Sequence, residues 1–303
     1  MFRKFAVMLV MAFVSGFIAV GVYAQEFKGG GSERTVFYEI KSDKTHIFLM
    51  GSIHFADENV YPLPRDVIEA FDNSANLVVE VDAGSIANQE KQNKFVPMLM
   101  YSGKESIKDH LSRRVFSMLE NYLKKNNMAS GAILKFKPGL LSIILTSRRL
   151  MELGFLPKFG IENFFLSRVK GQKNVFELES IEEQMGLFLS IKDADADKFM
   201  ERTLIDLDRM GKLMNVVVAA WKRGDVEALN KLLLLDPIKE DSSMLPIMKT
   251  FFFDRNIRMA SKIESLLQRD DISFVVVGAG HLIGDKGIIA ILQNKGIYQI
   301  RQL

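Results

Sequence analysis

The sequence contains no cysteine, and this absence removes several kinds of chemistry at once. Disulfides, cysteine nucleophiles, thiolate zinc sites and iron–sulfur clusters are all excluded. Histidine is also scarce, because the chain has only His46, His54, His110 and His281. Any metal site must therefore use nitrogen and oxygen ligands, and few residues can supply the nitrogen.

A large excess of charge of one sign is missing too. Lys and Arg together number 40 and Asp and Glu 37, which gives a formal net charge of +3 over 303 residues. This near-neutral balance gives no electrostatic case for nucleic acid as a partner. With 48% hydrophobic and 25% charged residues, the composition is that of a globular protein rather than a disordered or fibrous one.

The N-terminus carries the three parts of a secretory signal. Met1–Lys4 is basic, residues 5–22 form an apolar run, and small residues end at Ala24, where a signal peptidase would cut. We expect residues 1–24 to be a signal peptide or, given the length of the apolar run, an uncleaved anchor that tethers the protein to a membrane. Residues 25–34, rich in glycine, are expected to form a flexible tether. Both alternatives predict a periplasmic or secreted protein.

Strand patterns occur at both ends of the remaining chain and helical patterns between them. Strands are predicted at residues 35–40, 45–50 and 77–81 near the start, and at 272–277 and 297–301 near the end. Residues 87–268 are mainly helical and contain one strand, 174–179. Neither end has enough strands for a sheet of its own. We therefore predict a single α/β domain over residues 35–303, with a mixed sheet formed from strands at both ends of the chain and a large helical middle region as an insertion.

Two copies of the pattern Gly-x-x-His follow predicted strands, Gly51-Ser-Ile-His54 and Gly278-Ala-Gly-His281. Glycine lets the chain turn sharply at a strand end, and the imidazole three residues later points into the crevice where open α/β sheets bind ligands. Two such loops can bring two neutral imidazoles together, as a divalent metal requires. His54 and His281 are therefore predicted metal ligands, the alternative being that each is structural.

A carboxylate at another strand end is the expected third ligand. Glu80 interrupts the apolar run of residues 77–81, where an unpaired charge is costly. The alternative for Glu80 is a buried ion pair with an arginine. Glu179 ends the 174–179 strand in the same way and is the second candidate.

These residues lie in longer segments that match a known pattern: Leu-Met-Gly-Ser-Ile-His54, Leu-Val-Val-Glu80-Val-Asp82, Glu-Leu-Glu179-Ser-Ile-Glu-Glu-Gln184, Asp254-Arg255-Asn256 and Val-Gly-Ala-Gly-His281-Leu-Ile-Gly284. Over nearly all of residues 35–303 the chain resembles the TraB/GumN family, which includes the TIKI-type metalloproteases and is distantly similar to erythromycin esterases and ChaN haem-binding proteins. The resemblance implies an α/β core with a helical insertion, a manganese- or cobalt-type centre, and peptidase or related hydrolase activity, which is shown for some members. The chain departs from the pattern at Glu162, where many members have Asp, and at Glu177, where a small residue is usual.

The resemblance implies functional roles for His54, Glu80, Arg255 and His281, and also for Glu179. On this basis the two histidines and Glu80 are expected to hold one divalent ion (manganese, cobalt or zinc) that lowers the pKa of a bound water. Glu80 or Glu179 would take the proton as general base, and Arg255 would offset the charge of the oxyanion. The alternative for Arg255 is a surface residue near a helix start.

The predicted function is that of an exported metal-dependent hydrolase, peptidase-like, acting on peptides or on small esters or amides. Two alternatives from other classes remain open at this stage. One is a non-catalytic haem- or metal-binding protein of the same fold, since a fold does not fix a function. The other is an interaction protein whose site has decayed. The oligomeric state is not assigned.

Overall fold

The computed structural model describes residues 35–81, 89–169, 171–242 and 245–303. The expected signal, tether and Asp82 lie outside these ranges. The contacts of the described chain form two compact units. Among the described residues, the sheet unit comprises residues 35–81, Gly154–Glu179 and Lys212–Leu303, and the helical unit comprises residues 89–153 and Ser180–Gly211. The single domain expected over residues 35–303 stays a prediction.

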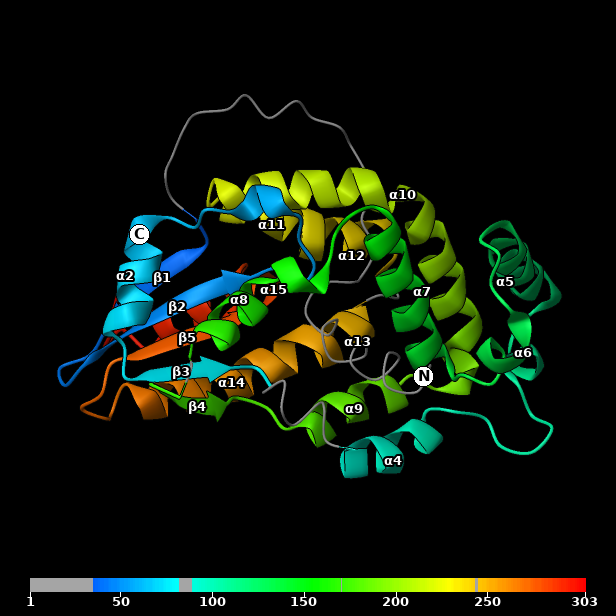
Figure 1. Ribbon diagram of the computed structural model, residues 1–303, viewed down its shortest axis with the longest axis horizontal. Coiled ribbons are helices and arrows are strands. Elements are labelled where there is room, and N and C mark those ends of the chain that lie inside the picture. Colours follow the sequence, from blue (N-terminus) through cyan, green and yellow to red (C-terminus); the bar gives the residue numbers. More distant parts are fainter. Residues whose placement is uncertain (1–34, 82–88, 170, 243–244) are drawn as a thin grey trace. The chain divides into compact units, whose positions relative to one another are not determined.

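One six-stranded sheet organises the sheet unit, and Figure 1 shows its strands side by side. Its order is β4-β3-β5-β2-β1-β6, with bounds β1 Phe37–Lys41, β2 His46–Ser52, β3 Asn76–Val79, β4 Asn174–Glu177, β5 Ser273–Gly278 and β6 Gln299–Gln302. Strands β4, β3, β5 and β2 are mutually parallel, whereas β1 is antiparallel to both β2 and β6. Because β2 pairs with β5 and β1 with β6, the predicted mixed sheet from both ends of the chain is confirmed.

The central strands are buried because their sequences are almost continuously apolar. Strands β3 and β5 are buried along their whole length, as expected for parallel strands covered on both faces. On one face, Phe71 of helix α2 (Arg65–Asn73) and Phe165 of helix α8 (Ile161–Arg168) pack on Phe274 of β5, with ring centroids 5.5 and 4.6 Å from it. These rings, each at most 1% exposed, anchor both helices to the sheet.

Most of the helices in the sheet unit are short. Besides α2 and α8 they are η1 Glu58–Val60, η3 Pro157–Phe159, the end of α10 (Ala196–Lys222), α11 Val226–Asn230, η5 Lys231–Leu235, α12 Asp236–Glu240, α13 Leu245–Met248, η7 Lys249–Phe253, α14 Asp254–Leu266, α15 Ala279–Leu282 and α16 Ile288–Gln293. Segments η5 and η7 are π-helical, so they interrupt two stretches that the sequence predicts as regular helix. Such interruptions are frequent at functional sites, and η7 ends two residues before Arg255 of α14.

The helical unit holds the remaining helices, namely α4 Gln89–Met98, η2 Ile107–His110, α5 Arg113–Lys125, α6 Ser130–Ile133, α7 Pro138–Glu152, α9 Ile181–Leu189, η4 Asp193–Asp195 and the first part of α10. Helices α7 and α9 pack so closely that a Cβ on Gly139 would lie 2.7 Å from the carbonyl oxygen of Phe188. The His110 ring stacks on Tyr101 at 4.5 Å, and the Tyr101 hydroxyl donates to Asp193 at 2.6 Å.

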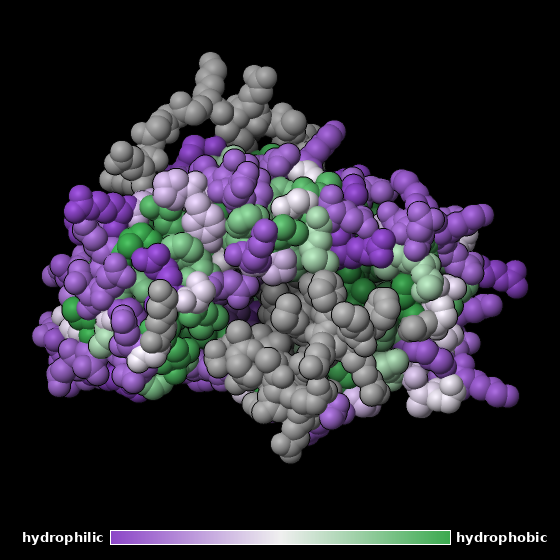
Figure 2. All heavy atoms as spheres, in the orientation of Figure 1, coloured by the Kyte–Doolittle hydropathy of each residue, from purple (hydrophilic) through white to green (hydrophobic). Residues whose placement is uncertain are grey.

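Hydrophilic side chains make up most of the margin of the described part in Figure 2. No helix among the described residues has both the length and the apolar character needed to cross a membrane.

Candidate metal centre

Strands β2, β3, β4 and β5 are parallel neighbours in the sheet (Figure 1). Each of them ends just before a predicted functional residue. His54 follows β2, Glu80 follows β3, Glu179 follows β4 and His281 lies in α15 immediately after β5. Parallel strands bring their carboxyl ends to one edge of the sheet, which is where open α/β folds bind ligands. The four residues therefore lie along one sheet edge, in the spatial order Glu179, Glu80, His281, His54.

The two Gly-x-x-His motifs are in contact. Ser52 and Gly278 are register partners in neighbouring strands, and a Cβ on Gly51 would lie 3.2 Å from the Cα of Ala279. Glycine is required at position 51 because of this lack of space. Two segments from opposite ends of the chain are thus brought together, as the sequence predicts.

The geometry around His281 fixes which ring nitrogen carries the proton. Its Nδ1 lies 2.6 Å from Oδ1 of Asn256, and Nδ2 of that amide donates to the carbonyl oxygen of Lys286 at 2.8 Å. The amide oxygen therefore faces the ring, so Nδ1 donates and Nε2 keeps its lone pair. Nε2 is buried, has no hydrogen-bond partner among the described residues, and lies 3.8 Å from Oε1 of Glu80.

A carboxylate holds the ring of His54 in the same manner. Nδ1 of His54 lies 2.9 Å from Oε1 of Glu162, which also accepts a hydrogen bond from the Ser52 hydroxyl. Helix α8 approaches closely enough for this contact because Gly160 has no Cβ, and a Cβ there would overlap the carbonyl oxygen of His54. Sequence reasoning left the role of Glu162 unassigned, although an acidic residue directly after Ile161 at a helix start was a usable signal.

Arg255 binds both predicted carboxylates. Its Nε donates to Glu179 at 2.9 Å and its Nη2 to Oε2 of Glu80 at 2.8 Å, while Oε1 of Glu80 accepts the Gly278 amide at 2.6 Å. The Arg255 side chain is 0% exposed, which excludes the alternative of a surface residue. The buried ion pair considered for Glu80 is present, so a metal would have to share this carboxylate with an arginine.

The pKa values of the two imidazoles are shifted in opposite directions. Burial, together with the positive charges of Arg255 and His54, holds the pKa of His281 well below its ordinary value of about 6.5. Burial alone would also lower the pKa of His54, but the charge and hydrogen bond of Glu162 outweigh it and raise that pKa. His281 therefore stays neutral, which is the form that binds a metal.

A pH dependence of stability follows for the metal-free protein. Below pH 6.5 the unfolded state protonates His281 and the native state does not, so its contribution to stability is present above pH 6.5 and is lost as pH falls. We expect the free energy of unfolding to drop by about 1 kcal/mol from this residue between pH 6.5 and 5.5. The raised pKa of His54 changes stability above pH 6.5, where the contribution of His54 is lost as pH rises. The two histidines therefore affect stability in different pH ranges.

Urea unfolding of wild type and His281→Gln in the presence of a chelator measures this difference. The variant should lose less stability than wild type between pH 6.5 and 5.5. Parallel curves for the two proteins over that range would show that His281 is protonated equally in both states.

The two histidines of the site fit the role of nitrogen ligands in a divalent metal centre. Neighbouring ligands of a tetrahedral ion lie roughly 3.4 Å apart, close to the 3.8 Å between Nε2 of His281 and Glu80. Histidine ligands usually donate their other ring N–H to an oxygen, as both rings do here. Among the described residues, however, no three His, Asp or Glu side chains already converge as a metal cage. Both oxygens of Glu80 are instead engaged by Arg255 and by the Gly278 amide.

The chain resembles known proteins over most of its length. YbaP of Escherichia coli strain K12 is 21% identical over 249 residues, which cover 82% of this chain and 88% of that protein. An uncharacterized protein of Treponema pallidum is 21% identical over 277 residues, 87% of this chain and 82% of the other. A metalloprotease TIKI homolog of Amphimedon queenslandica is 29% identical over 104 residues, 34% of this chain and 17% of that protein. No solved structure matches.

The pattern of the TraB/PrgY/gumN family matches residues 36–301, which include every residue of the site described above. The resemblance noted from the sequence is confirmed by this match. The chain therefore belongs to the TraB/PrgY/gumN family.

Proposed function

We propose that this protein is an exported metal-dependent hydrolase of peptidase-like type. The observation that carries the proposal is Nε2 of His281, a buried lone pair with its ring fixed by Asn256 and with no hydrogen-bond partner among the described residues. A buried acceptor without a partner is costly unless a ligand satisfies it. The partial similarity to a metalloprotease TIKI homolog supports the peptidase-like class.

His54 and His281 would hold the ion, with Glu80 as the third ligand. A bound divalent ion would supply a water of lowered pKa. The tasks of this chain are to present the two rings in one tautomer, through Glu162 and Asn256, and to keep the buried side of the site dry. The side chains of His54 and Glu162 are 17% and 13% exposed, against 0% for His281, so a substrate would approach from the His54 side.

Glu80 or Glu179 is the proposed proton acceptor. Glu80 and Glu179 lie at adjacent strand ends, and both are held by Arg255, whose guanidinium is buried and bound on several sides. We therefore assign Arg255 to positioning these carboxylates rather than to contact with an oxyanion.

Metal-dependent cleavage of a mixed peptide pool, followed by mass spectrometry, tests this function. Wild type with manganese, cobalt or zinc should cleave peptides, and chelation or His281→Ala should abolish cleavage. His46→Ala is the matched control and should retain activity, because His46 lies at the opposite end of β2. Metal or haem binding without any cleavage would instead favour the non-catalytic alternative.

Export is tested by the N-terminus of the protein recovered from cells. A cleaved signal predicts a chain that begins at Gln25 and leaves the cytoplasm. A full-length protein in the membrane fraction indicates the uncleaved anchor, and a full-length cytoplasmic protein would contradict export.

A further inference from the structure

A cavity of about 680 Å³ lies in the sheet unit, at residues that the metal centre does not use. Cavities of this size are typical of sites for small organic ligands. The residues between β2 and α2 form one wall, α2 forms the next, and the end of α10 closes the pocket. It is lined by Thr35, Val60, Pro62, Leu63, Pro64, Arg65, Asp66, Glu69, Trp221 and Lys222.

The cavity has an apolar floor. Val60, Leu63 and Trp221 are 2%, 7% and 1% exposed, so their side chains form the base rather than the rim. The position of Trp221 is fixed, because its Nε1 donates to the carbonyl oxygen of Gly51 at 2.6 Å and its own carbonyl oxygen accepts from Thr35 at 3.2 Å. A rigid apolar floor favours a ligand with an aliphatic side chain.

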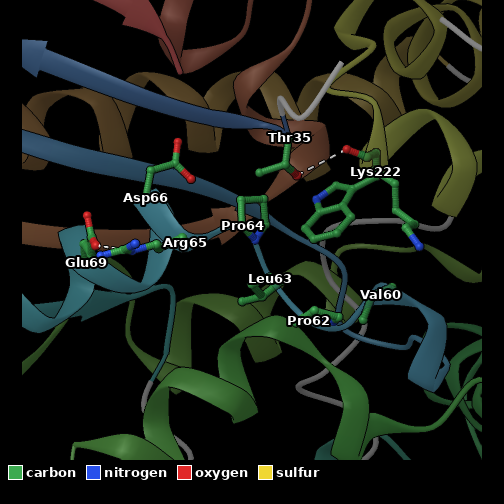
Figure 3. A pocket seen from close by; sticks show the side chains of 10 residues that line it. Thr35, Val60, Pro62, Leu63, Pro64, Arg65, Asp66, Glu69 and Lys222 are labelled. Atoms are coloured by element: carbon green, nitrogen blue, oxygen red, sulfur yellow. Dashed lines mark hydrogen bonds and ion pairs between the residues drawn. The ribbon is translucent and has the colours of Figure 1, made fainter. Parts of the chain in front are cut away.

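The rim carries opposite charges on opposite sides. Figure 3 shows Asp66 at one side and Lys222 at the other, with Pro64 between them. Arg65 and Glu69 pair with each other at 2.6 Å, so the Asp66 side keeps one net negative charge. Neither Asp66 nor Lys222 forms an ion pair with another residue in the described part of the chain.

We propose that this cavity binds a short peptide with free termini, its amino group at Asp66, its carboxylate at Lys222 and an aliphatic side chain on the floor. Only a ligand with a positive and a negative end matches both charges, and an apolar centre matches the floor. This inference goes beyond the proposed function and does not require the metal centre to bind a metal.

Fluorescence provides a direct test, because Trp221 is the only tryptophan in the chain and forms part of the floor. The full chain is titrated with Ala-Leu-Ala in three forms: free, N-acetylated and C-amidated. The free peptide should change the Trp221 emission saturably, and each blocked form should bind roughly 3- to 10-fold more weakly. The same titration of His281→Ala should give the same affinities, which separates this site from the metal centre.

Charge-reversal variants test which residue binds each end of the peptide. Asp66→Lys should weaken binding of the free peptide by a similar factor but leave binding of the acetylated form unchanged. Lys222→Glu should leave binding of the amidated form unchanged. Both residues are exposed, so neither variant should impair folding. The proposal is overturned by an unchanged emission at millimolar free peptide, by equal binding of all three forms, or by octanoate binding as tightly as the peptide. The last result would assign the cavity to apolar anions.

Discussion

Replacement of Arg255 by methionine is expected to lower the free energy of unfolding by about 3–5 kcal/mol at neutral pH. The variant leaves Glu80 and Glu179 in the interior, 5% and 2% exposed, without the cation that binds them both. Much of this loss should be recovered as pH falls, because protonation of the two carboxyl groups removes the uncompensated charge. Urea unfolding at pH 7 and pH 5 measures both effects.

Arg258→Met is the matched control for this experiment. Arg258 lies in the same helix and is 3.9 Å from Glu179, but its side chain is 47% exposed. Its loss should change stability by less than about 1 kcal/mol. In the Arg255→Met background, Glu80→Gln with Glu179→Gln should restore part of the stability. Equal losses for the two arginine variants, or no recovery from the glutamines, would contradict the account of a buried charge cluster.

His54→Ala and His281→Ala are each expected to abolish metal binding, from about one ion per chain to near zero. Each change removes one imidazole nitrogen, and the Nε2 of His281 is the better defined of the two donors. Asn256→Leu should keep both imidazoles but release the ring of His281, which lowers metal affinity by about 10- to 100-fold. Elemental analysis after dialysis against manganese, cobalt or zinc gives the stoichiometry, and competition with a chelator gives the affinity.

His46→Ala and His110→Ala control for a general loss of histidine. His46 packs edge-on to Phe48, and His110 stacks on Tyr101 in the helical unit. Both variants should bind metal as wild type does. Full stoichiometry in either His54→Ala or His281→Ala would remove that residue from the proposed ligand set.

The sequence was informative where local rules dominate. A glycine turn after an apolar strand placed His54 and His281 at strand ends, and parallel pairing then brought those ends to one edge of the sheet. Glu80 was recognisable because a charge within an apolar run needs a partner. The strand predicted at residues 174–179 is present as Asn174–Glu177.

The partners of those residues were harder to predict because they depend on tertiary packing. Asn256 and Glu162 reach the imidazoles only because α14 and α8 pack beside the sheet edge. The burial of Arg255 had no local signature, since an arginine near a helix start is usually exposed. The π-helical turn before it also depends on packing, because its sequence, Lys249–Phe253, is compatible with an ordinary helix.

Anomalous diffraction from crystals soaked in zinc tests the central claim most directly. The account predicts one strong peak about 2.1 Å from Nε2 of His281 and at bonding distance from an imidazole nitrogen of His54. A zinc ion bound away from these two rings, for example beside His110 and Glu105, or rings of His54 and His281 that stay without a peak at full zinc loading, would contradict it.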